Sequence, residues 1–144
     1  DFVLRKMKYL QPFCYETFKK MYKAGVKIAM GTDMGFEPDM GSNAAELEIY
    51  VKLGMKPMDA ILTTTRNAAQ ALKMEKDLGT LEAGKYADLI AVDGDPLRNI
   101  RCLQEKKNIR LVMKEGRVYA DRRPGQAKNV VNVKPGDWKI IDYL

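Results

Sequence analysis

A short apolar run that ends in a carboxylate constrains the fold of this chain more than any other feature. Residues 25–35 read GVKIAMGTDMG, with glycines on both sides of the apolar positions and Asp33 just past their end. The run is shorter than a helix needs, so it predicts a buried strand. In parallel α/β proteins the carboxyl ends of strands carry the chemistry, which makes Asp33 a candidate catalytic residue. An aspartate in this position can instead form a turn or cap the next helix.

The residues before this run predict a helix that leads directly into the strand. Residues 1–10 are basic and apolar and are expected to end an earlier helix, whereas Pro12 suits the first turn of a new one. Gly25 suits the position just past the helix end. A helix followed at once by a strand implies a parallel neighbouring strand. The apolar stripe of the predicted helix is Cys14, Phe18, Met21 and Tyr22.

A loop without periodicity follows Asp33 over residues 34–42. It contains glycine and proline and carries two further carboxylates, Glu37 and Asp39. Carboxylates alone suit magnesium or calcium better than zinc.

Two helices are expected after this loop. Ser42 or Asn43 can cap the first, with Glu46 in the place of a capping-box acid, and Gly54 ends it. Pro57 begins the second helix, whose apolar residues keep the helical period to about residue 73. Three consecutive threonines in this second helix are poor helix formers, and their place in a strong apolar stripe indicates close packing on a sheet.

The second half of the chain has the character of β structure. From residue 76 onward the predicted elements are a strand at 87–92, a short helix at 97–105, a hairpin at 109–120 and, in a polar tail, a strand at 129–133. We therefore expect an α/β chain in three parts: the closing unit of an α/β barrel or of a layered sheet at 1–75, part of a β-sandwich at 76–121 and a polar tail at 122–144.

Composition excludes several classes of protein. The 144 residues are 46% apolar and 31% charged, which is typical of a soluble globular protein. No apolar run is long enough for a membrane span, and no signal-peptide pattern is present, so we expect no membrane partner. The two cysteines, Cys14 and Cys102, lack metal-site spacing and form no disulfide framework, and the second of these observations favours a reducing, cytoplasmic location. The net charge is +6, but the basic residues are scattered without interleaved aromatic residues, so we expect no nucleic-acid partner.

The chain contains no histidine, which removes the commonest metal ligand and general base. It begins with Asp1, followed at once by apolar residues. A complete (β/α)8 barrel needs about 250 residues. We therefore expect this sequence to be a piece of a longer polypeptide.

Several short motifs, in this order and spacing, resemble the C-terminal part of a metal-dependent amidohydrolase. They are GTD at 31–33, EL at 46–47, GMKPMDA at 54–60, TRNAA at 65–69, LGTLEAGKYADLI at 78–90 and DP at 95–96. The resemblance covers about residues 11–120. Its nearest branches are the imidazolonepropionase-like and the prolidase-type, Xaa-Pro dipeptidase-like members.

The resemblance implies a (β/α)8 TIM barrel with one or two divalent metals, usually zinc, and a small β-sandwich assembled from both ends of the chain. It makes Val26–Gly31 barrel strand eight. It makes Asp33 the aspartate that binds the metal and accepts a proton from the attacking water. The implied substrate is a small-molecule amide or peptide. The histidines and the lysine of the family lie upstream, and where relatives often carry one more histidine this chain has Asp39 or Met40.

Two hypotheses follow. In the first, the chain is a fragment of a metal-dependent hydrolase of C–N bonds, possessing no tightly bound zinc and no activity by itself. In the second, it is a non-catalytic structural or interaction fragment that self-associates through exposed sheet edges and apolar helix stripes. We expect a homo-oligomer.

Overall fold

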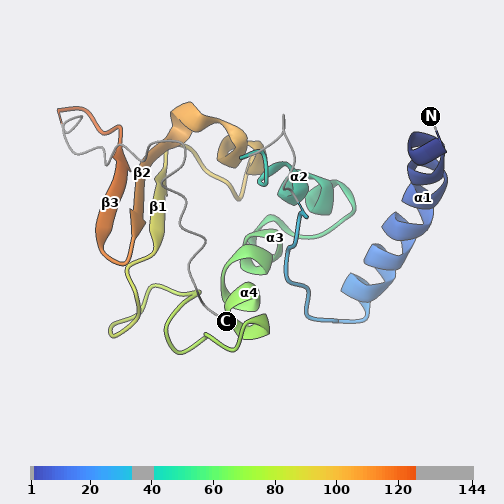
Figure 1. The fold of residues 1–144 in the computed structure, drawn as a ribbon, viewed down its shortest axis with the longest axis horizontal. Coiled ribbons are helices and arrows are strands. Elements are labelled where there is room, and N and C mark those ends of the chain that lie inside the picture. Colours follow the sequence, from blue (N-terminus) through green and yellow to red (C-terminus); the bar gives the residue numbers. More distant parts are fainter. Residues whose placement is uncertain (1, 34–40, 126–144) are drawn as a thin grey trace.

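The computed structural model describes residues 2–33 and 41–125 of the chain. Glu37, Asp39, Met40 and the predicted strand at 129–133 lie outside the described residues. Figure 1 shows the long helix α1 at one end, a small sheet at the other, and three short helices between them. The elements are α1 (Phe2–Lys23), α2 (Ala45–Lys52), α3 (Pro57–Thr64), α4 (Arg66–Ala71), β1 (Leu89–Val92), η1 (Ile100–Gln104), η2 (Lys106–Asn108), β2 (Ile109–Lys114) and β3 (Arg117–Asp121).

Helix α1 is one continuous helix, so the prediction that a new helix begins at Pro12 is wrong. Pro12 lies inside α1, where it removes one backbone hydrogen bond but leaves the helical turns on both sides intact. The predicted C-terminal glycine is confirmed, because Gly25 has φ +74°. The N–H groups of Gly25 and Val26 donate to the carbonyls of Tyr22 and Met21, which is the Schellman pattern.

The strand predicted over Val26–Gly31 is not present: residues 26–33 lie outside every described helix and strand. A strand needs a neighbour to complete its hydrogen-bond ladder. Within residues 2–33 and 41–125 no strand lies beside this segment, and its backbone bonds to helices instead. The apolar composition of a strand is present in this segment, but the described residues provide no neighbouring strand to pair with it.

The long helix predicted from Pro57 to about residue 73 divides at Thr65 into α3 and α4. Thr65 has φ −121° and ψ −100°, outside the helical region. The hydroxyls of Thr63, Thr64 and Thr65 all donate to carbonyls three or four residues back, at 2.6–3.1 Å. Such back-bonding competes with the helix and bends it, which explains the break.

The side-chain cap predicted for α2 is also wrong. The N-cap residue is Ala44, and no side chain accepts a hydrogen bond there. Ser42 contributes only its carbonyl, which accepts from the N–H of Ala45 at 2.9 Å. The carboxylate of Glu46 accepts a hydrogen bond from the hydroxyl of Tyr50 instead of reaching back to the cap.

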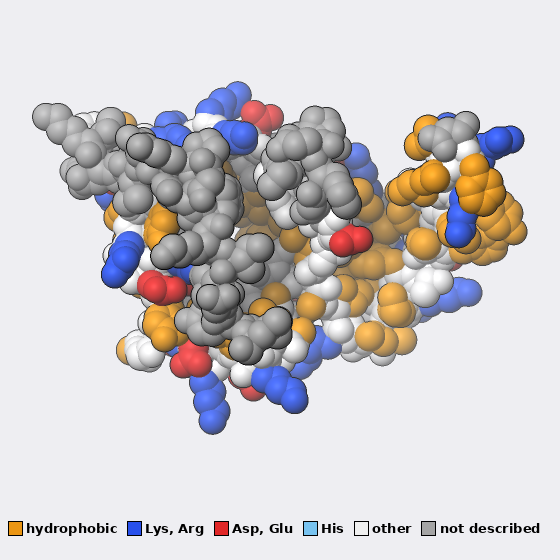
Figure 2. Space-filling view, viewed as in Figure 1, with side chains coloured by type: hydrophobic (Ala, Val, Ile, Leu, Met, Phe, Trp, Pro, Cys, Tyr) orange, Lys and Arg blue, Asp and Glu red, His pale blue; other side chains and the backbone are white. Residues whose placement is uncertain are grey.

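The core lies between the C-terminal end of α1, the helices α2 and α3, and η1. Its buried members are Leu47, Tyr50, Met55, Ala60 and Ile100. The ring of Phe18 stacks on that of Tyr50 with centroids 4.7 Å apart, which joins α1 to α2. Along most of its length, however, α1 keeps its apolar side chains in solvent: Phe2 is 73% exposed and Phe13 59%. Figure 2 shows hydrophobic side chains gathered on the surface of α1.

The second half forms a three-stranded antiparallel sheet in the order β1-β2-β3. The predicted hairpin is confirmed, with β2 and β3 joined at Glu115 and Gly116, both of positive φ as a tight hairpin turn requires. The predicted strand at 87–92 begins at Leu89, and the predicted short helix corresponds to η1.

None of the helices in the described part of the chain combines the length and apolar character that a membrane crossing requires.

Candidate functional site

Asp33 lies at the end of the extended segment 26–33, with its side chain exposed. Its φ is +50°, in the left-handed region, which aspartate tolerates better than most residues other than glycine. Its carboxylate makes no hydrogen bond or ion pair with another described residue. The structure therefore presents a free carboxylate on an unusual backbone conformation.

The segment that carries Asp33 is held at every second residue. The contacts are Asn67 Nδ2 to the carbonyl of Ile28 (2.9 Å), the N–H of Met30 to the carbonyl of Thr63 (3.0 Å), and Asn43 Nδ2 to Thr32 Oγ1 (3.2 Å). A period of two is that of an extended chain, in which successive residues point to opposite sides and every second residue points to the same side. One side of the segment is therefore fixed to α3, to α4 and to the residues before α2.

The described residues supply at most part of a metal site. Among residues 2–33 and 41–125, no group of three or more histidine, cysteine, aspartate or glutamate side chains comes together to hold a metal ion. A catalytic zinc site takes three protein ligands. The exposed carboxylate of Asp33 could supply one oxygen ligand, and a complete zinc site would need further ligands from outside the described residues.

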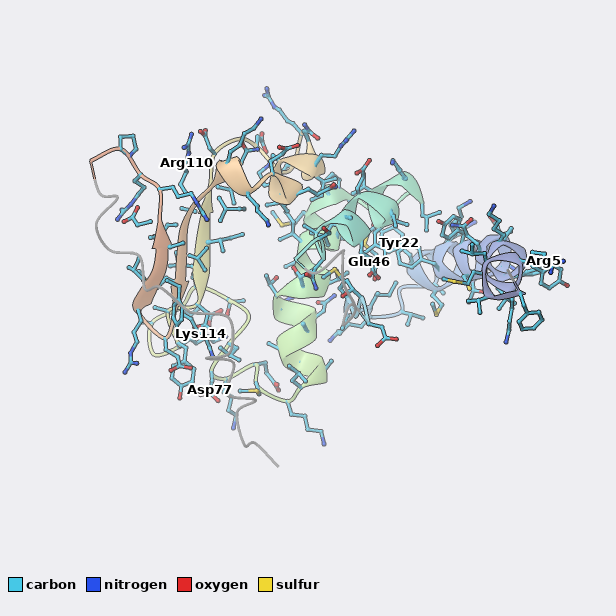
Figure 3. All side chains as sticks on the ribbon, turned by 45° about the horizontal axis from the view of Figure 1, so that its top comes forward. Arg5, Tyr22, Glu46, Asp77, Arg110 and Lys114 are labelled. Carbon is cyan, nitrogen blue, oxygen red and sulfur yellow. The ribbon has the colours of Figure 1, made fainter. Side chains whose placement is uncertain are left out.

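A hollow of about 210 Å³ lies at the opposite, amino-terminal end of the segment, between α1 and α3. There the hydroxyl of Tyr22 donates to the carboxylate of Asp59 at 2.6 Å and accepts from the N–H of Lys56 at 3.2 Å. The hydrogen bond to Asp59 raises the pKa of Tyr22. Figure 3 shows Tyr22 where α1 meets the central helices.

This pair was not predicted from the sequence, where Tyr22 was included only in an apolar stripe and Asp59 only within the motif at 54–60. The available signal was that a tyrosine in a buried stripe needs a partner for its hydroxyl. Since Tyr22 and Asp59 bond to each other and join two helices, we assign them to the stability of the fold.

A second hollow, of about 560 Å³, lies between α3, α4, the turn at 78–81 and β1. Its lining is mainly apolar, and its one carboxylate is already engaged. Asp88 Oδ1 accepts the N–H of Glu115 at 2.7 Å and so anchors the hairpin turn. Neither hollow contains Asp33, and the larger one is not where the candidate catalytic group lies.

The fold and the site define the class of protein: an α/β chain with a carboxylate at the end of an extended segment backed by helices, followed by a small antiparallel sheet. The sequence profile of the amidohydrolase family matches residues 15–119, more than half of the chain. The chain belongs to the amidohydrolase family.

Particular relatives are similar over the same region. Ochratoxinase from Aspergillus niger is 37% identical over 106 residues, which cover 72% of this chain and 22% of that protein. Its crystal structure has a TM-score of 0.73 and 34% identity, covering 87% of this chain and 30% of that one. A crystal structure of a Xaa-Pro dipeptidase with methionine bound in the active site has a TM-score of 0.69 and 44% identity, covering 75% of this chain and 26% of that one. Imidazolonepropionase from Shouchella clausii is 29% identical over 109 residues, which cover 72% of this chain and 24% of that protein.

The chain thus spans about a quarter of the length of the proteins it matches, between 22% and 30% in these three relatives.

Proposed function

We propose that the intact protein hydrolyses a C–N bond with the help of a divalent metal, zinc, and that this chain contributes Asp33 to the site. The observation that supports the proposal is the exposed carboxylate of Asp33 in a GTD motif, at the end of a segment held at every second residue. Family membership supplies the reaction class. We assign residues 1–75 to the C-terminal part of a (β/α)8 barrel, 76–121 to a β-sandwich and 122–144 to a tail.

When bound, a divalent metal polarises the scissile carbonyl and lowers the pKa of a water molecule. The role of Asp33 is that of ligand and general base. A carboxylate has two oxygens, so one can face the metal while the other accepts the proton of the attacking water. Because the side chain is exposed in this part of the chain, the proton can pass from it to solvent or to the leaving nitrogen.

The substrate class we propose is a small-molecule amide or peptide. By their names, similar proteins act on ochratoxin, on imidazolonepropionate and on Xaa-Pro dipeptides. All three are small molecules, and an Xaa-Pro dipeptide contains a C–N bond of the proposed kind. We place the protein in the cytoplasm, with no nucleic acid or membrane as partner.

A second candidate function is supported by the surface of α1. Tyr9 is 70% exposed, and Phe2 and Phe13 accompany it on a helix that has no buried residue. An apolar surface of this kind favours association. In this alternative the chain is a structural fragment that self-associates, and in the intact protein the same surface supports a homo-oligomer.

The experiment that tests the proposal uses the full-length protein. Its metal content is measured after purification without chelator, and its turnover is measured with Xaa-Pro dipeptides and with other small amides. We expect one or two equivalents of zinc and hydrolysis of at least one amide. A full-length protein with neither bound metal nor hydrolysis of any amide, ester or lactam contradicts the proposal.

A further inference from the structure

Asn43 makes a contact that its position at the start of a helix does not explain. As a residue just before α2 it is well suited to cap that helix, yet α2 has no side-chain cap. Asn43 Nδ2 donates instead to Thr32 Oγ1 at 3.2 Å. A residue that could stabilise its own helix is bonded to the neighbour of Asp33.

Asp33 is the residue for which such a contact matters. A non-glycine residue at φ +50° is held in a sparsely populated conformation, and it stays there only where its surroundings fix it. Asn67 and Thr63 fix the segment at Ile28 and Met30, five and three residues before Asp33. In the described part of the chain, the contact from Asn43 is the one that reaches the residue next to Asp33.

The contact also joins two residues eleven positions apart in sequence, on either side of Asp33. Thr32 cannot move away from α2 without breaking it. The orientation of the Asp33 backbone is thereby tied to the start of α2, whose buried residues Leu47 and Tyr50 belong to the core. The contact is exposed to solvent, and through one side chain it links the segment that carries the candidate catalytic carboxylate to the start of α2.

We infer that Asn43 is a positioning residue, which acts through Thr32 to hold the carboxylate of Asp33 in the orientation that metal binding and proton transfer require. The inference rests on the function proposed above for Asp33. Outer partners that orient a metal-binding group typically change metal affinity or activity by about 10–100-fold when they are removed. Thr32 is also a positioning residue, because it connects Asn43 to Asp33.

The test is a double-mutant cycle in the full-length protein with Asn43→Leu, Thr32→Val and the two combined. The readouts are kcat and KM for the best amide substrate, zinc affinity by competition with a chelating indicator, and Tm. We expect each single variant to lose about tenfold in kcat and in zinc affinity. We expect the double variant to be no worse than the poorer single one, because both substitutions remove the same contact.

Two further variants separate positioning from general damage. Thr32→Ser keeps the accepting hydroxyl and should retain kcat within about threefold, since the contact is preserved. Ser42→Ala lies in the same turn, its hydroxyl has no partner among the described residues, and it should leave every readout unchanged. Losses that multiply in the double variant, or that appear in Tm and KM with kcat and zinc affinity unchanged, overturn the inference.

Asp33→Asn distinguishes this inference from the proposal on which it rests. If that variant keeps its turnover and zinc, the proposed role of Asp33 is wrong and the positioning role falls with it. If Asp33→Asn loses both while Asn43→Leu and Thr32→Val keep both, the proposed function stands and the positioning role alone is refuted.

Discussion

Gly79→Ala tests whether the two halves of the chain pack as closely as the structure shows. Gly79 has φ +91°, and a Cβ placed on it would lie 2.6 Å from the Cβ of Ala69 and 3.1 Å from the Cα of Arg66. Carbon atoms pack best at about 3.5–4.0 Å, so the added methyl group overlaps α4 by about 1 Å. Helix α4 and the turn at 78–81 would have to separate to admit it.

The expected destabilisation has two parts. A left-handed backbone costs about 1–2 kcal/mol for a residue with a Cβ. Overpacking of the added methyl group against α4 costs about a further 1–3 kcal/mol. The total for Gly79→Ala is therefore about 2–5 kcal/mol.

Gly84→Ala is the matched control. Gly84 also has positive φ, +89°, but a Cβ there would meet nothing within 4 Å. It should show only the backbone part, so the difference between the two variants isolates the clash at about 1–3 kcal/mol. The assay is thermal unfolding of the full-length protein, in which each kcal/mol shifts the Tm of a 150–250-residue domain by about 2–4 °C. Equal losses for both variants would refute the close approach of the turn to α4.

Three further predictions concern the fold and the chain by itself. Tyr22→Phe should destabilise the protein by about 1 kcal/mol, because Asp59 loses its hydrogen-bond donor. Folding raises the pKa of Tyr22, so this stabilisation is fully present below about pH 10 and is lost as the pH rises through the pKa of the folded state. Urea unfolding of both proteins at a series of pH values measures this. Asp121→Asn should remove an acid-dependent loss of stability, because the hydrogen bonds and charge of Arg123 lower the pKa of Asp121. The stability that Asp121 contributes is therefore present above the ordinary aspartate pKa and is lost as the pH falls through the pKa of the folded state. Unfolding of the variant and of wild type in steps from pH 5 to pH 2 measures this. The isolated 144-residue chain should bind no stoichiometric zinc and should self-associate, and light scattering with metal analysis would contradict this by showing a monomer with one zinc.

Features encoded by neighbouring residues were predicted well from the sequence. The predicted hairpin over 109–120 is confirmed. It could be predicted because the alternation of apolar and polar residues and the turn at Glu115-Gly116 are local signals. The same holds for the end of α1 at Gly25. In each case the residues that specify the structure are the residues that form it.

Features decided by distant partners were predicted less well. Residues 26–31 have the composition of a strand, but a strand also needs a neighbour, and the described residues supply helices instead. The prediction that Ser42 or Asn43 caps α2 is wrong, because no side chain caps this helix and the amide of Asn43 donates to Thr32, eleven positions away. The break at Thr65 depends on which carbonyls the threonine hydroxyls select, which the helical period does not show.

The role of Asp33 illustrates the same limit. The sequence placed this aspartate at the end of the segment, and the structure shows it there with φ +50° and an exposed carboxylate. Its role as ligand and base stays a prediction, because it depends on groups that the described residues do not include.

The central claim is tested most directly by the turnover and zinc content of full-length Asp33→Asn. Asparagine keeps the shape of aspartate and tolerates the same positive φ, but it cannot accept the proton. We expect kcat to fall by about 10²–10⁴-fold, the contribution of a general base, with the fold intact by circular dichroism. Asp77→Asn, an exposed carboxylate whose side chain has no partner among the described residues, should stay within about twofold of wild type. Near-full turnover by Asp33→Asn would contradict the account and leave Asp33 as a turn residue only.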